Sequence, residues 1–330
     1  MVNPSSLNLT LANFTYFCLQ DRLVIHKARI VINELSLVGP SFLGFYMSKR
    51  TANSILTEAL AAYQDIDNPR IKEILQAAIK HVHAFASELK LTHEEWLEGV
   101  EYLTDIGHMC TDGRQEFILL SDLLGLSALV ELQDRDAMGI ETPGSVVGPF
   151  HATGSPFIPI GASIDLDHVQ GGETALVRGK VRDMDGNPIA GAELDIWQTA
   201  PNQLYAIQDD NQSENNLRGK QLTDEEGNYG FITVKPVPYT VPRDGPCGRI
   251  LDVSGRHGMR TAHIHIKIEA EGVKPLTTEI YPDDDPYLDD DTVFGSCQAL
   301  TMQYVKNTDP NIPVDLIGDF DFFVRRGAVS

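Results

Sequence analysis

The chain has 330 residues, of which 42% are apolar and 22% are charged, and these proportions exclude a disordered, collagen-like or low-complexity protein. A chain of this length forms one or two globular domains and can bury a sizeable core. It carries 26 lysines and arginines against 47 aspartates and glutamates, a formal charge of −21, so its average field repels nucleic acid and anionic membranes.

The first 46 residues mix short apolar runs with isolated charges, and they lack the small-residue cleavage site of a signal peptide. No stretch of 18 uninterrupted apolar residues occurs that would span a bilayer. At Met47 the composition of the sequence changes, and this methionine could itself be the translation start. Residues 1–46 are therefore either a true N-terminal extension or an upstream start in the gene, and the sequence leaves both open.

Helical signals extend from Asn53 to about Asp134. Asn68-Pro69 combines an N-cap with a proline at the first helical position, and Thr92-x-x-Glu95 is a capping box that opens a second helix. A third, strongly apolar helix follows. Residues 47–134 are thus predicted to form a helical domain whose apolar faces suit a cap or a dimer interface. In the first helix the apolar positions recur at i, i+3 and i+4: Ile71, Ile74, Leu75, Ala78, Val82 and Phe85.

Residues 135–165 contain five glycines and four prolines, a density that ends helices and marks a linker or loop. Apolar and polar residues then alternate in short runs, separated by turn signals such as Asp185-Gly186 and Glu226-Gly227. No G-x-G-x-x-G loop appears, so a dinucleotide fold is not supported. The sequence predicts an α+β protein: a small N-terminal helical domain, then a linker and an antiparallel β-sandwich over residues 135–330.

A pair of histidines in the second half is the first chemical signal. His263 and His265 lie inside an alternating run, and residues i and i+2 of a strand point to the same face, so both imidazoles can reach one point. That arrangement suits a metal site. The alternative is two polar side chains on an exposed strand face, and the pair alone does not decide between them.

Three motifs accompany this pair, and the third of them contains it. They are D-x-W with a tyrosine eight residues after the tryptophan (Asp195 to Tyr205), K-P-V-x-Y (Lys235 to Tyr239) and G-R-H-x-x-R-x-A-H-x-H (Gly255 to His265). In order and spacing they resemble the intradiol ring-cleaving dioxygenases over about residues 53–305. The segments R-Q-E-F-I-L-L-S-D-L-L-G (114–125) and V-x-G-P-F-H (146–151) are most similar to the hydroxyquinol 1,2-dioxygenase branch.

The resemblance implies a non-haem Fe(III) centre bound by Tyr205, Tyr239, His263 and His265. Two tyrosinates would offset two of the three charges of the ion, which prefers oxygen donors. Tyr239 would leave the metal and act as a general base, and Arg260 would stabilise negative charge on the substrate ring. The implied reaction inserts both atoms of O2 into a catechol-type diol and cleaves the ring between its hydroxyls.

The resemblance also implies the substrate contacts. Asp122 is the informative one, because a carboxylate could accept a hydrogen bond from a third ring hydroxyl. Hydroxyquinol, opened to maleylacetate, is therefore the expected substrate. The alternatives are catechol or another substituted catechol, and a non-catalytic β-sandwich binding module. The expected substrate contacts are Leu119, Asp122, Gly148, Pro149, Val241, Pro242, Arg260 and Glu279.

Two positions depart from the family pattern. Gln203 stands where the family commonly has glycine, so the loop could approach the metal differently. Glu279 stands where catechol-cleaving relatives carry a neutral polar residue, and it could either alter substrate choice or pair with Arg260. The acidic run from Asp283 to Asp291 lacks the pattern of a calcium loop and is expected to be solvated.

The sequence and the resemblance also bear on the binding partners and the cellular compartment of the protein. The family's helical part forms a homodimer and can enclose a lipid, and the apolar helix faces allow both here. The substrate and O2 are the other partners, with no nucleic acid and no membrane-spanning segment. The four cysteines lie far apart with no C-x-x-C pair, which favours a reducing, cytoplasmic compartment.

Overall fold

A computed structural model describes residues 50–111, 113–134, 140–168 and 171–327. The predicted segment 1–46 lies outside the described residues. The chain divides into two compact units, Met1–Glu95 and Trp96–Ser330, and each is described by itself. The predicted division at residues 46 and 134 stays a prediction.

The first unit contains α4 (Ala52–Ala62) and α5 (Pro69–Leu89). Asn68 caps α5 as predicted, since its side chain accepts hydrogen bonds from the backbone N–H groups of Arg70 and Ile71. Neither helix contains a fully buried residue. The apolar side chains of α5 are instead exposed, with Val82 at 64% and Phe85 at 57%.

Four more helices follow in chain order: α6 (His93–Met109), α7 (Glu116–Leu123), α8 (Leu126–Asp134) and, later, α9 (Pro246–Ser254). The predicted capping box opens α6, because Thr92 and Glu95 exchange reciprocal hydrogen bonds. Helix α7 is the predicted apolar helix, and it buries Leu119 and Leu123. Among the described residues, no helix is long and apolar enough to cross a membrane.

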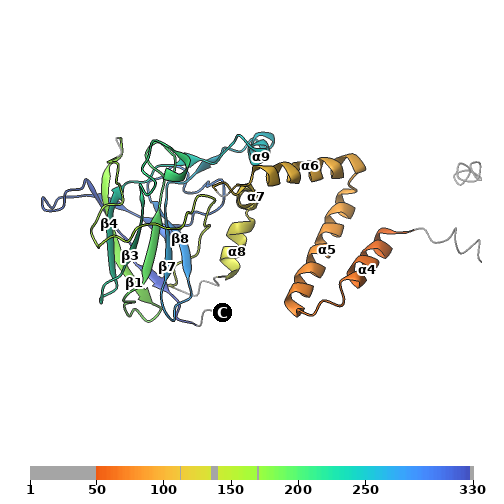
Figure 1. The fold of residues 1–330 in the computed structure, drawn as a ribbon, viewed down its shortest axis with the longest axis horizontal. Helices are drawn as coiled ribbons and strands as arrows, with labels where there is room; N and C mark the ends of the chain where they lie inside the picture. Colours follow the sequence, from red (N-terminus) through yellow and green to blue (C-terminus); the bar gives the residue numbers. More distant parts are fainter. Residues whose placement is uncertain (1–49, 112, 135–139, 169–170, 328–330) are drawn as a thin grey trace, which may run out of the picture. The chain divides into compact units, whose positions relative to one another are not determined.

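The second unit contains two five-stranded sheets. One has the order β10-β11-β1-β12, with β4 also paired to β1, and the other has the order β3-β2-β7-β8-β9. The neighbours β7 and β8 lie side by side in Figure 1. The strands of the first sheet are β1 (Thr174–Asp183), β4 (Asn228–Val234), β10 (Tyr304–Lys306), β11 (Leu316–Asp319) and β12 (Phe322–Val324). The strands of the second are β2 (Glu193–Trp197), β3 (Arg218–Leu222), β7 (Ile264–Glu269), β8 (Leu276–Pro282) and β9 (Thr301–Met302).

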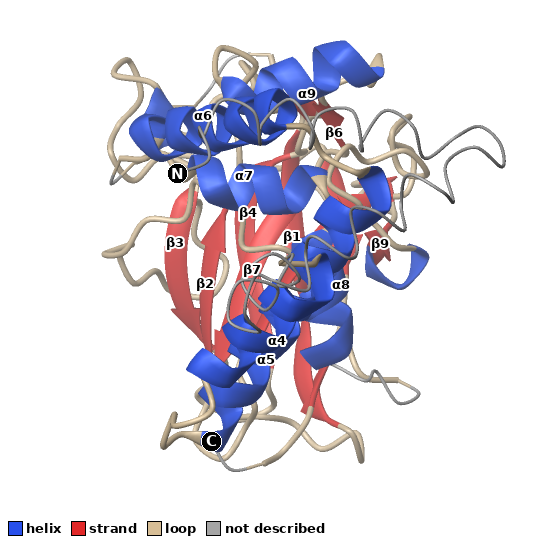
Figure 2. Cartoon of the chain, turned by 90° about the vertical axis from the view of Figure 1, so that its right-hand side faces the viewer, coloured by secondary structure: helices blue, strands red, loops and turns tan. Residues whose placement is uncertain are grey.

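One hydrophobic core joins the two sheets. It contains Val177 and Val181 from β1 together with Ile264, Ile266 and Ile268 from β7, all fully buried. The isoleucines alternate with polar residues, so one face of β7 packs inside the sandwich and the other carries polar groups. Figure 2 shows β3, β2 and β7 side by side in the second sheet.

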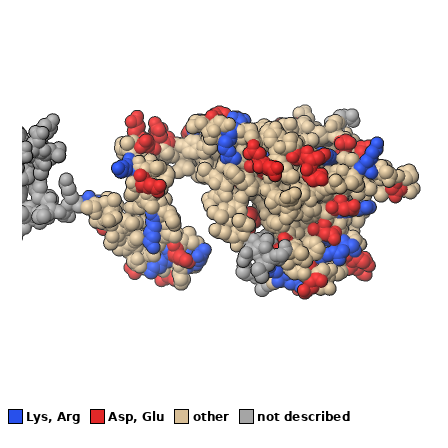
Figure 3. All heavy atoms as spheres, turned by 180° about the vertical axis from the view of Figure 1, so that it is seen from behind, with Lys and Arg blue, Asp and Glu red and all other residues tan. Residues whose placement is uncertain are grey.

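The α+β class and the sandwich are confirmed, and one detail differs from the expectation of antiparallel strands. Strand β1 pairs parallel with both β11 and β12, and β8 pairs parallel with β9. The long connections between these strands allow parallel pairing, which a two-residue turn does not. A separate two-stranded ribbon of β5 (Tyr239–Thr240) and β6 (Met259–Arg260) completes the fold. On the face drawn in Figure 3, acidic and basic side chains are interspersed.

Candidate metal centre

The two histidines of the H-x-H motif share the polar face of β7, as predicted. His263 directly precedes the strand and His265 lies in it, while Ile264 between them points into the sandwich core. Their Nε2 atoms are 3.1 Å apart, and both side chains are buried. Thr261 supplies the carbonyl that lies 2.6 Å from His263 Nδ1, which assigns the proton to Nδ1 and leaves Nε2 as an acceptor.

Two tyrosines from different segments meet these imidazoles. Tyr205 begins a 3-10 turn in the loop after β2, and Tyr239 lies in β5. The Tyr205 hydroxyl oxygen lies 3.1 Å from that of Tyr239, 3.3 Å from His263 Nε2 and 3.1 Å from His265 Nε2. The Tyr239 hydroxyl oxygen lies 3.5 Å from His263 Nε2. The structure therefore brings together all four residues predicted as ligands.

The spacing of these four donor atoms fits a single cation. Donors that each lie about 2 Å from one ion are separated by about 3.3 Å when arranged as a tetrahedron. The five donor pairs given above are 3.1 to 3.5 Å apart. The donor set of two phenols and two imidazoles thus matches the size and the chemistry of a site for a hard transition-metal ion.

The protonation states also favour a cation. Burial, followed by the Arg260 charge, lowers the pKa of His263 to about 4, and burial holds the pKa of His265 well below its ordinary value. Burial raises the pKa of both the Tyr205 and Tyr239 phenols above 10. Neutral imidazoles are ready to bind a metal, whereas the phenols ionise only if a strongly polarising cation lowers their pKa.

A buried charge cluster adjoins the four donors. The Arg260 guanidinium forms a two-point ion pair with Glu279, at 2.8 and 3.1 Å, and contacts Asp291 at 3.1 Å. Arg260 Nη1 lies 3.2 Å from His263 Nε2. Burial alone would raise the pKa of Glu279, but Arg260 and then the two imidazoles hold it well below its ordinary value. The cluster of Arg260, Glu279 and Asp291 lies directly beside the donors.

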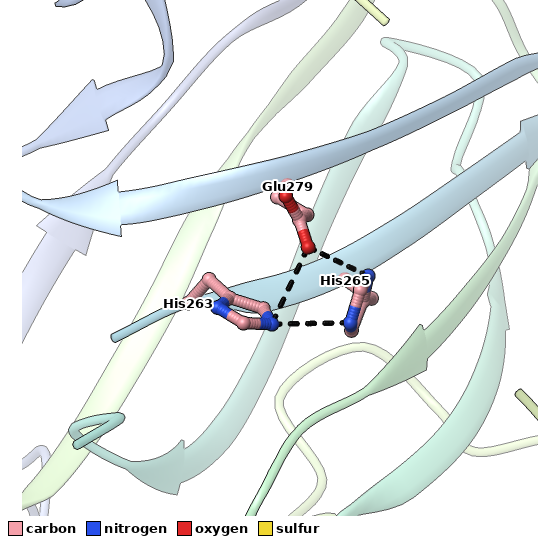
Figure 4. Close-up of side chains that lie close together, drawn as sticks. All are labelled: His263, His265 and Glu279. Carbon is pink, nitrogen blue, oxygen red and sulfur yellow. Dashed lines mark hydrogen bonds and ion pairs between the residues drawn. The ribbon is translucent and has the colours of Figure 1, made fainter. Parts of the chain in front are cut away.

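Glu279 could itself be a metal ligand, because its carboxylate forms a compact group with His263 and His265 (Figure 4). Its two oxygens are already engaged by Arg260, and Oε2 also accepts hydrogen bonds from Ser145 and Tyr281. The tyrosine hydroxyls, by contrast, lie against each other and against the imidazoles. The Tyr/Tyr/His/His set is therefore the better ligand set.

Aromatic packing fixes the site from one side. The Trp197 ring stacks on His265, with centroids 4.6 Å apart and planes at 7°, because the two residues are cross-strand partners on β2 and β7. Phe150 packs on Tyr205 at 5.0 Å, and His151 lies against Trp197 and contacts Asp195. The roles of Trp197 and Phe150 were not predicted, although both residues stand inside the motifs.

The predicted substrate contacts fall into two groups. Gly148 lies against the His265 ring, and its φ of +71° is a conformation that glycine adopts readily. Leu119 and Val241 are buried in one apolar cluster beside Asp122 on α7. Pro149 and Pro242 adjoin these groups in the chain and are half-buried. Their contacts with a substrate remain predictions.

Asp122 combines burial with an unsatisfied oxygen. Its side chain is 2% exposed, and Oδ1 has no hydrogen-bond partner. Burial raises its pKa to about 6, against opposing effects of a Ser127 hydrogen bond and the Arg260 charge. An unpaired buried carboxyl oxygen is costly, so this one is suited to a ligand that carries a donor.

Two expectations from the sequence need correction or comment. The acidic run is not wholly solvated: Asp291 is 5% exposed and pairs with Arg260, because the loop folds back onto the site. Gln203 adopts a φ of +69°, the left-handed conformation that glycine favours. The backbone therefore keeps the shape that a glycine would give it, and Tyr205 still reaches the other donors.

Comparisons with known proteins identify the relatives of this chain. Two family models match the chain: the one described as Catechol dioxygenase N terminus over residues 68–139, and the one described as Dioxygenase over residues 148–325. The chain is 39% identical to the hydroxyquinol 1,2-dioxygenase of Rhizobium sp. (strain MTP-10005), over 81% of this chain and 88% of the relative. It is 38% identical to the 6-chlorohydroxyquinol 1,2-dioxygenase of Cupriavidus pinatubonensis, over 84% of this chain and 99% of the relative. The solved hydroxyquinol 1,2-dioxygenase of Pseudomonas putida DLL-E4 has a TM-score of 0.75 and 39% identity, covering 83% of this chain and 98% of that one.

Proposed function

Because the chain belongs to the intradiol ring-cleaving dioxygenase family, we propose that it opens hydroxyquinol (benzene-1,2,4-triol) to maleylacetate, inserting both atoms of O2. Fe(III) is the metal we assign, with Tyr205, Tyr239, His263 and His265 as its ligands. The convergence of these four donor atoms within 3.1 to 3.5 Å carries the proposal. When bound, Fe(III) supplies the Lewis acidity that ionises the phenols and the diol and activates the diol toward O2.

Tyr239 is the general base in this proposal. It would accept one proton of the diol, and its hydroxyl oxygen lies 3.1 Å from that of Tyr205. Arg260 is the backbone partner of Tyr239 in the β5–β6 ribbon, so its guanidinium is held beside the donors. A buried cation at that place stabilises negative charge that develops on the substrate ring.

Asp122 supports hydroxyquinol over catechol. Its unpartnered Oδ1 lies in an apolar cluster with Leu119 and Val241, where a third ring hydroxyl would donate a hydrogen bond to it. Catechol lacks that hydroxyl and would leave the carboxylate buried and unpaired.

Iron content and the visible spectrum of the purified protein test the metal site. We expect close to one iron per chain and a tyrosinate-to-Fe(III) charge-transfer band that shifts when hydroxyquinol is added anaerobically. Oxygen uptake is then compared with hydroxyquinol, catechol and protocatechuate, and hydroxyquinol should be fastest. A coloured protein that prefers catechol would contradict the substrate assignment, and a protein that stays colourless after iron reconstitution would contradict the four-ligand site.

We also propose that α5 forms part of a homodimer interface. A helix whose apolar side chains are half or more exposed, as Val82, Phe85 and Leu89 are, requires a cover in water. A second copy of the chain supplies one, and the apolar surface can enclose a lipid chain between the copies. Native mass spectrometry tests both points, since it reports the subunit number and any bound lipid mass.

A further inference from the structure

A buried carboxylate that is not a ligand lies beside the proposed iron site. Glu279 is the cross-strand partner of His265, on the same face of the sheet, and it is fully buried. Its Oε1 lies 3.3 Å from His265 Nδ1 and 3.3 Å from His263 Nε2 (Figure 4). The Nδ1 of His265 makes no hydrogen bond within the described residues, and the Glu279 carboxylate lies against it at ion-pair distance.

The carboxylate is held rigidly in this position. Arg260 binds both of its oxygens, while Ser145 donates a hydrogen bond to Oε2 at 2.6 Å and Tyr281 donates a second. The space beside them is closed by Gly295, where an added Cβ would lie 3.0 Å from Arg260 Nη2 and 3.1 Å from Glu279 Oε2. Glu279 therefore has little freedom to move toward a substrate.

The charges of the Arg260, Glu279 and Asp291 cluster indicate a role for Glu279 beside the metal. Arg260 alone is paired with two buried carboxylates, Glu279 and Asp291, so the cluster retains one net negative charge. Fe(III) bound by two tyrosinates retains one net positive charge. A buried charge is costly unless an opposite charge lies close to it, and the two sites adjoin each other.

Resting on the proposed iron site, we propose that Glu279 is a positioning residue for the metal. It orients the His265 imidazole through Nδ1 and offsets the positive charge that Fe(III) keeps after two tyrosinates bind. Carboxylates behind metal-bound histidines raise the basicity of the imidazole and fix its orientation. Asp291 pairs with Arg260 and accepts a hydrogen bond from the Gly295 N–H, and among the described residues it makes no hydrogen bond or ion pair with either histidine.

The substitution Glu279→Gln tests this role, because it keeps the shape of the side chain and removes its charge. Asp291→Asn is the matched control, since it removes an equally buried charge from the same arginine. We expect E279Q to lower the affinity for Fe(III) about 10- to 100-fold. At saturating iron its charge-transfer band should move to longer wavelength, because a less compensated ion is easier to reduce.

The midpoint potential gives a readout that does not depend on turnover. The ratio of Fe(III) to Fe(II) affinity should fall about tenfold in E279Q, which corresponds to about 59 mV for one electron. D291N should change the band and the ratio much less. Equal shifts in the two variants, or no shift in E279Q, would overturn the proposal, whereas a wild-type protein without the band would instead refute the iron site.

Tyr281→Phe gives an independent test if E279Q does not fold. It removes one hydrogen bond from Glu279 Oε2 and leaves the carboxylate in place with more of its charge available. The band should then move to shorter wavelength, opposite to the shift in E279Q. A shift to longer wavelength, or none, would overturn the proposal.

Discussion

In the proposed substrate site, Asp122 is the side chain that would select hydroxyquinol, because its Oδ1 is buried without a hydrogen-bond partner. We expect Asp122→Asn to lower kcat/KM for hydroxyquinol about 10- to 100-fold, the usual value of a hydrogen bond to a charged group. The value for catechol should stay the same or rise, because catechol offers no third hydroxyl. Steady-state oxygen uptake measures kcat/KM for each of the two substrates. An equal loss of kcat/KM for both would show that Asp122 has only a structural role.

The same residue should make stability depend on pH. Burial raises the pKa of Asp122 from 3.8 to about 6, so the folded state binds a proton more tightly than the unfolded state. Its contribution to stability is full below the unfolded pKa and is lost as pH rises toward the folded one. Removing the ionisable group should therefore stabilise the protein more at pH 8 than at pH 5, by about 1 to 2 kcal/mol. Urea unfolding of D122N and wild type at both pH values measures the difference, and a gain that does not change with pH would contradict this account.

Much of the ligand set could be predicted from sequence because each ligand stands in a short motif. The strand period alone places His263 and His265 on one face. Ser145 and Asp291 could not be assigned in this way, since two distant loops bring them to the site. For Glu279 the sequence left two roles open, and the structure shows the ion pair with Arg260. Asp291 was wrongly expected in solvent because a run of aspartates usually is solvated.

Among the elements, β1 has the tightest backbone constraint. It pairs with β11 through residues 175–178 and with β12 through residues 181–183, and the change of partner occurs at Gly179. A Cβ at Gly179 would lie 1.8 Å from the carbonyl oxygen of Phe320. The strands cannot keep their register around such a contact.

We therefore expect Gly179→Ala to lower the free energy of unfolding by more than about 3 kcal/mol, or to prevent soluble expression. Gly99→Ala on α6 is the control, because its added Cβ meets nothing within 4 Å and alanine favours a helix by up to about 1 kcal/mol. Urea denaturation of both variants gives the comparison. Wild-type stability in G179A would show that β1 and the chain after β11 are not packed as described.

Local signals explain which elements could be predicted. The caps at Asn68 and Thr92 act within a few residues, and both helices begin where expected. The parallel pairs of β1 depend on strands more than 130 residues away, and the chain gives no local sign of them. Alternation in the sequence identified the strands, but it does not specify their partners.

For the whole molecule, assembly through α5 is the testable property. Val82→Glu with Phe85→Glu places two charges on the apolar face and should shift a dimer to monomers, as measured by light scattering. Lys80→Glu changes the net charge by the same two units and lies on the opposite side of the helix. It should leave the subunit number unchanged. If both variants stay dimeric, another surface holds the subunits together.

The order in which the ribosome delivers the strands has a consequence for synthesis. The sheet that carries the ligands is complete in the chain at Met302, whereas β11 and β12 of the other sheet end only at Val324. Until those last strands emerge, β1 lacks two of its three neighbours, and the cover over Ile264, Ile266 and Ile268 is unfinished. A chain without β11 and β12 would leave part of the inner face of this sheet uncovered, so we expect completion of these two strands to limit aggregation during synthesis.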